Sequence, residues 1–115
     1  MNPTREQLEL AAKAAGIKGW WSGSCYCYGY NGNQNVPIPW QPWEHKPDSF
    51  DLMVACRIEP EFFDNCVTAT ALGVMWDEWL KDHNNDKGLA TMWAVFLCAV
   101  EIGRASVCVV DKDSK

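Results

Sequence analysis

The chain has 115 residues, 48% of them hydrophobic and 22% charged, which is the size and composition of one globular domain that buries its own core. Its 15 acidic and 10 basic residues give a formal net charge of -5, and the basic residues form no run. This excludes duplex nucleic acid as an expected partner, because phosphate binding needs clustered lysine and arginine.

Targeting signals are not evident in the sequence. It starts with no basic segment leading into an apolar stretch, and it contains no run of about 18 apolar residues. We therefore expect neither secretion nor a membrane partner, and we expect a cytoplasmic location.

The residues that carry metal and catalytic chemistry form no known motif. Six cysteines at irregular spacings predict free thiols, because thiols stay reduced in a cytoplasm. A zinc site built from Cys25, Cys27 and His45 is an alternative, but structural zinc sites usually contain Cys-x-x-Cys pairs, so we expect no metal and no cofactor. Nucleophile elbows, phosphate-binding glycine loops and His-Glu-x-x-His patterns are also missing, which predicts a protein that is not an enzyme.

The first third of the chain predicts a helix followed by a β-hairpin. A helix is expected over residues 4–15, which begin with a capping-box pattern and end before a glycine. A hairpin is expected over residues 20–30, because a Ser22-Gly23-Ser24 break separates Trp20-Trp21 from a segment of alternating tyrosines, and Asn31-Gly32 signals a turn after it.

The middle of the chain predicts a loop and a short helix. Residues 35–47 contain four prolines, and since each removes a backbone donor, we expect an ordered but irregular loop. A helix is expected from Asp48 to about Arg57. The side chains that should face the core from this helix are Phe50, Leu52, Met53 and Cys56.

The last part of the chain predicts a second hairpin and the longest helix. Residues 66–72 and 74–80 are expected to pair, although the second of these segments also fits helical spacing. An amphipathic helix is expected over residues 89–100 and should stop at Gly103. Residues 104–115 then form a weak edge strand or a flexible tail.

Together these elements predict an α+β fold in the order α-β-β-α-β-β-α. A small antiparallel sheet of two hairpins should pack against two to three helices, with residues 1–103 as a single domain.

The seven tryptophans are the most informative feature of the sequence. We assign Trp76, Trp79 and Trp93 to the core. Trp40 and Trp43 differ, because a loop rarely supplies two indoles to a core and neighbouring prolines hold them in place. Such rings can stack on a purine or pack against a partner, and a nearby cation can neutralise a phosphate. The predicted ligand-binding residues are Trp40, Trp43, Tyr26, Tyr28, Tyr30, Trp21, Arg57 and Lys46.

Several landmarks resemble the NinX-like group of small proteins from temperate phages, a family without an established biochemical role. They are a helix ending in Ala14-Ala15-Gly16, a Trp40-x-Pro42-Trp43 loop followed by Asp48 and an aliphatic helix into Arg57-Ile58, and a closing helix ending in Glu101-Ile102-Gly103. The resemblance spans most of residues 4–103, while the cysteine-tyrosine hairpin and the C-terminal tail depart from the group. It implies an origin among phage accessory genes, many of which counter host defences.

Two functions are expected from these features. The first is a non-enzymatic phage accessory protein that counters host defence by binding and sequestering a nucleotide-derived signalling molecule. The alternative is an acidic inhibitor that docks on a host defence protein such as a nuclease, whose nucleic-acid channel is basic. A small enzyme with two facing carboxylates is a third possibility. Exposed aromatic surface would also suit a homo-oligomer.

Overall fold

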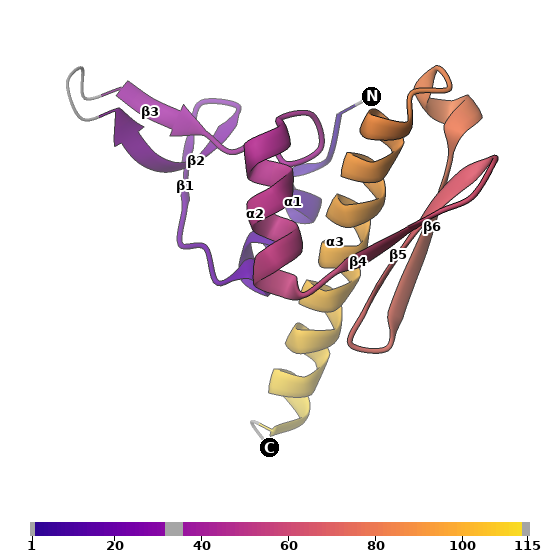
Figure 1. The fold of residues 1–115 in the computed structure, drawn as a ribbon. Coiled ribbons are helices and arrows are strands. Elements are labelled where there is room, and N and C mark those ends of the chain that lie inside the picture. The colour runs from indigo at the N-terminus through magenta and orange to yellow at the C-terminus, as the bar shows by residue number, and fades with distance from the viewer. Residues whose placement is uncertain (1, 32–35, 114–115) are drawn as a thin grey trace.

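The computed structural model describes residues 2–31 and 36–113, except for the side chains of residues 30–31 and 106–113. Three α-helices and two three-stranded antiparallel sheets lie within these residues (Figure 1). The predicted α+β class and the predicted order of helices and hairpins are confirmed. The strands form two separate sheets, because each predicted hairpin gains a third strand from a neighbouring segment.

Helix α1, Arg5–Ala15, has the ends that the sequence predicts. The Thr4 hydroxyl accepts a hydrogen bond from the Gln7 backbone N–H at 3.1 Å, and the Gln7 side chain accepts one from the Thr4 N–H at 2.9 Å. Gly16 ends the helix with φ of 73°, a left-handed conformation that glycine adopts without strain.

The first sheet contains β1, Trp20–Ser22, β2, Cys25–Asn31, and β3, Val36–Pro39, in that order. The expectation of an irregular loop over residues 35–47 was wrong for β3, which pairs antiparallel with β2. Its two prolines lack an N–H, but β3 is an edge strand, where a missing donor costs no ladder hydrogen bond.

The second sheet follows helix α2, Lys46–Cys56, which begins slightly before the predicted start. Strands β4, Glu59–Phe62, β5, Cys66–Ala71, and β6, Val74–Trp79, pair in chain order. The predicted pairing of β5 with β6 is confirmed, so the helical alternative for this segment is excluded.

The two faces of β6 differ in their surroundings. Trp76 is half-buried on the face that packs on the core, whereas Trp79, which the sequence assigns to the core, is 48% exposed. The reason is the strand period, since residues at odd and even positions of a strand point to opposite faces of the sheet.

Helix α3, Lys87–Asp113, corrects the prediction for the C-terminal region. It does not stop at Gly103, and the backbone of residues 104–113 is helical, so the predicted edge strand is wrong for these residues. Gly103 lies where α3 crosses α1, and a Cβ atom there would overlap the Leu10 carbonyl oxygen. Gly103 therefore lies inside α3 and permits a close contact between α3 and α1, and it does not end the helix.

The core is organised around α3. Figure 1 shows α3 running through the molecule between the β4–β6 sheet and the pair α1 and α2, and it contacts all three. The tryptophan predicted in the core on this helix, Trp93, is 5% exposed. Residues from Trp93 to Val100 are buried apart from Leu97, so this helix is enclosed on several sides.

One described segment, Lys87–Ala105 of α3, is long and apolar enough to cross a membrane by length and composition. Of that window, 61% is buried inside the protein, as in the core helix of a folded domain, so the feature is weak evidence for a membrane span.

We predict that Gly103→Ala destabilises the protein by about 2 kcal/mol or more, because the new methyl group must push α1 away from α3. Urea unfolding measures the change. Gly88→Ala in the same helix is the control, since its methyl group would meet only the tip of the Asp86 side chain. We expect the control to stay within about 1 kcal/mol of the wild type. Equal midpoints for both variants would contradict the proposed helix contact.

Candidate functional site

The predicted aromatic site lies mostly in the core. Trp40 is 2% exposed, Trp43 is 8% exposed and Tyr26 is 9% exposed. The Trp43 ring packs 6.0 Å from the Phe96 ring of α3. The expectation that prolines hold these indoles out in solvent was wrong. The loop packs against the core, and both indole rings are part of that core.

Most of the remaining predicted residues serve the fold or stand apart. Trp21 is half-buried under the Arg5 guanidinium, whose carbon lies 4.0 Å from the ring centroid. Arg57 caps the C-terminus of α2 and Lys46 lies in its first turn, so these two cations are at opposite ends of one helix. The side chain of Tyr30 lies outside the described residues. The predicted residues whose side chains the structure describes therefore do not form one surface.

Tyr28 is held by a buried carboxylate. Asp48 is 3% exposed and accepts hydrogen bonds from the Gln41 backbone N–H at 2.9 Å and from the Tyr28 hydroxyl at 3.3 Å. His45 Nδ1 lies 3.1 Å from the same carboxylate. Burial and the Asp48 charge raise the pKa of Tyr28 above its usual value, because both disfavour the phenolate. Asp48 thus fastens β2 and the proline loop to the start of α2.

A small cleft does adjoin the buried aromatic residues. Its volume is about 270 Å³, and Tyr26, Trp40 and Trp43 reach it with part of their surfaces. Among the buried side-chain polar atoms that the structure describes, only Trp43 Nε1 has no hydrogen-bond partner. The charged residue at this cleft is Glu44, which would repel a phosphate.

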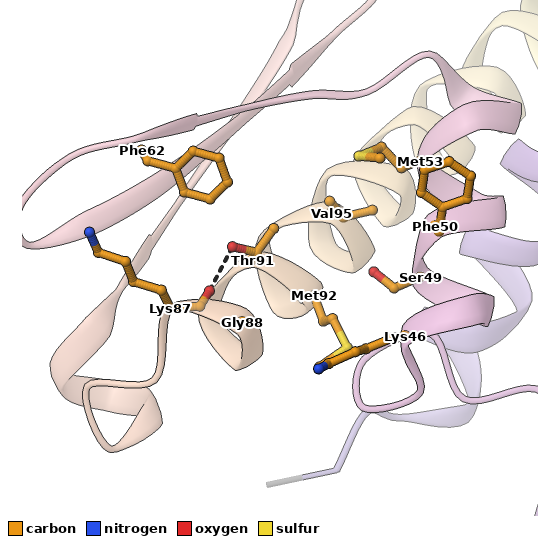
Figure 2. A pocket seen from close by; sticks show the side chains of 10 residues that line it. All are labelled: Lys46, Ser49, Phe50, Met53, Phe62, Lys87, Gly88, Thr91, Met92 and Val95. Atoms are coloured by element: carbon orange, nitrogen blue, oxygen red, sulfur yellow. Dashed lines mark hydrogen bonds between the residues drawn. The ribbon is translucent and has the colours of Figure 1, made fainter.

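Exposed apolar side chains gather elsewhere, between α2, the first turns of α3 and the end of β4. They border a groove of about 380 Å³ that we call the α2–α3 groove (Figure 2). Phe50 of α2 is 59% exposed and Phe62 of β4 is 57% exposed, so both rings are largely in solvent. The lining residues are Lys46, Ser49, Phe50, Met53, Phe62, Lys87, Gly88, Thr91, Met92 and Val95.

The groove arises because α2 is apolar on more than one face. Leu52 and Cys56 are buried as predicted, but Phe50 and Val54 point outward, which corrects the expectation that Phe50 faces the core. A surface helix normally has a polar outer face, and here that face carries exposed apolar side chains beside polar ones such as Asp51. The sequence contained this signal, since apolar residues continue from 52 to 56 without a polar interruption.

Phe62 is exposed for a different reason. It pairs with Val67, which is fully buried, and therefore lies on the inner face of the sheet. Phe62 remains exposed at the last residue of an edge strand.

Polar groups of the groove are few and specific. Lys46 and Lys87 contribute two cations, and Thr91 donates its hydroxyl hydrogen bond to the Lys87 carbonyl at 2.6 Å. Ser49 is 6% exposed, and its hydroxyl has no hydrogen-bond partner among the described residues. The lining contains no carboxylate, imidazole or thiol, so its polar side chains are the two lysines and the two hydroxyl groups.

Metal and thiol chemistry have little support in the described part of the chain. No group of three or more histidine, cysteine, aspartate or glutamate residues is placed to hold a metal there. Burial raises the pKa of Cys56 and of Cys98 to about 11, so both remain protonated thiols at neutral pH.

No protein-family model matches this chain, and comparisons with curated proteins and with solved structures also found no match. The resemblance to the NinX-like group therefore stays a prediction, and the functional inference depends on the site itself.

We predict that Asp48→Ala lowers the free energy of unfolding by about 2 to 4 kcal/mol, because it leaves the partly buried Gln41 N–H without its acceptor and releases Tyr28. Asp51→Ala, on the exposed side of the same helix, should change stability by no more than about 0.5 kcal/mol. Ultraviolet titration should also show a lower pKa for Tyr28 in Asp48→Ala. Similar stability in both variants would show that Asp48 does not fasten these elements.

Proposed function

We propose that this protein acts by binding another protein and catalyses no reaction, and that the α2–α3 groove holds an acidic amphipathic segment of that partner. In the context that the NinX-like resemblance implies, the partner is a host protein whose activity in defence is inhibited. The exposed pair of phenylalanines across the groove is the observation that carries this proposal.

Apolar area supplies the main driving force for such docking. Covering the exposed parts of Phe50 and Phe62 would contribute roughly 1 kcal/mol or more for each ring. Met53 and Met92 also line the groove, and flexible thioether side chains adapt to the shape of a bound helix. An apolar groove of this kind is a common receptor for one face of an amphipathic helix.

Charge selects the type of segment. The protein has a net charge of -5, yet the charged residues that line the groove are the two cations Lys46 and Lys87. Acidic residues beside the apolar ones would complement these cations, whereas a basic segment would be repelled. The partner surface proposed for this groove is therefore acidic, whereas the nuclease channel expected from the sequence is basic.

We predict that a photo-crosslinking phenylalanine analogue at position 50 captures a discrete host protein in lysate, because the ring at that position would contact the partner. The analogue at Leu72 is the matched control. Leu72 is 78% exposed and comes directly after the last residue of β5, whereas Phe62 pairs with the start of β5. Adding Phe62→Asp to the position-50 protein should abolish the product. The same products from both positions, or none from position 50, would contradict the proposal.

Sequestration of a nucleotide-derived molecule is a second candidate. It is favoured by the cleft beside Tyr26, Trp40 and Trp43, where Trp43 Nε1 lacks a hydrogen-bond partner among the described residues. Release of an intact nucleotide from the purified, heated protein would support this second function. Nucleotide sequestration is the weaker of the two candidate functions, because the rings are buried and the Glu44 carboxylate would repel a phosphate.

A further inference from the structure

We infer that the α2–α3 groove contains a carboxylate-binding corner, formed by Lys46, Ser49 and the first turn of α3, and that it receives an aspartate or glutamate side chain of the docked segment. The inference rests on the proposed function, because it specifies the chemistry of the same occupant.

The helix period places the corner at one end of the groove. Lys46, Ser49 and Phe50, with Met53 one turn further on, follow the i, i+3, i+4, i+7 spacing of a single helix face. The polar residues of that face come first and the apolar residues last. The groove therefore changes along α2 from a polar end to an apolar end.

Ser49 is the part of the corner that lacks a partner. It is 6% exposed, its backbone N–H donates to the His45 carbonyl at 3.0 Å, and its hydroxyl has no partner within the described part of the chain. In Figure 2 the Ser49 oxygen points away from α2 toward α3, into the groove. The Ser49 hydroxyl is therefore free to donate a hydrogen bond to an acceptor atom of a ligand that lies in the groove.

The surrounding charge favours an anion at this position. Figure 1 shows that α2 and α3 begin at the same end of the molecule, so the positive ends of both helix dipoles lie on one side of the groove. Lys46 adds a full positive charge there. Asp86 accepts from the Leu89 N–H at 3.0 Å and Asp48 lies in the first turn of α2, so each helix N-terminus already has a carboxylate and the uncompensated positive charge at the corner is that of Lys46.

A carboxylate fits this set of groups better than a phosphate does. The corner has one hydroxyl and one lysine, without the arginine forks or glycine-rich loops that hold phosphate oxygens. Lys87 extends away from Lys46 in Figure 2 and so serves a second acidic residue of the segment. The apolar wall of Phe50, Met53 and Val95 begins next to the corner, so the carboxylate must be attached to an apolar body.

The test uses three small probes that share a phenylpropyl body and differ in their head groups: phenylpropionate, phenylpropanol and phenylpropylamine. Amide NMR of the full chain measures the affinity of each probe from shifts at Phe50 and Met53. We expect the carboxylate to bind about tenfold more tightly than the alcohol, as one charge-assisted hydrogen bond would provide, and the amine to bind least.

Two variants assign the effect to the corner. Ser49→Ala and Lys46→Gln should each bring the carboxylate-to-alcohol ratio close to one, while Lys81→Gln, an exposed lysine in another part of the surface, should leave it unchanged. Equal binding of all three probes would overturn the carboxylate corner and leave the apolar docking groove intact. Failure of every probe to shift Phe50 and Met53 would overturn both the corner and the proposed docking function.

Discussion

The packing of the proline loop against α3 determines which surface remains free for a partner. Trp43 lies against Phe96, and Trp40 is buried beside Tyr26, so the loop contributes to the interior. Asp48 then fixes the start of α2 to the same loop. With α2 held in this orientation, Leu52 faces the core and Phe50 faces outward. The α2–α3 groove is thus a consequence of how the loop is buried.

Much of the fold could be predicted because its signals are local. The capping box at Thr4 and the left-handed Gly16 define α1 from neighbouring residues alone. The third strand of each sheet could not be predicted in this way, because pairing partners are set by the tertiary structure. Gly103 shows the same limit, since a glycine near a helix end fits both a terminus and a close contact, and only Leu10 of α1 distinguishes them.

The site was less predictable than the fold because exposure depends on what covers each residue. An indole beside prolines has the same sequence pattern whether the loop points outward or packs inward, and here Trp40 packs inward. Phe62 shows the opposite case: its pairing with buried Val67 predicts burial, but its ring is 57% exposed at the end of an edge strand. Lys46 alone of the predicted binding residues lines the groove.

The burial of Trp40 and Trp43 is tested most directly by fluorine NMR of protein labelled with fluorotryptophan, assigned by Trp→Phe variants and recorded with a soluble gadolinium chelate. We expect the Trp40 and Trp43 signals to keep their line widths and the signal of Trp79, which is 48% exposed, to broaden. Broadening of Trp40 and Trp43 to the extent seen for Trp79 would contradict their place in the core and return the binding surface to the proline loop.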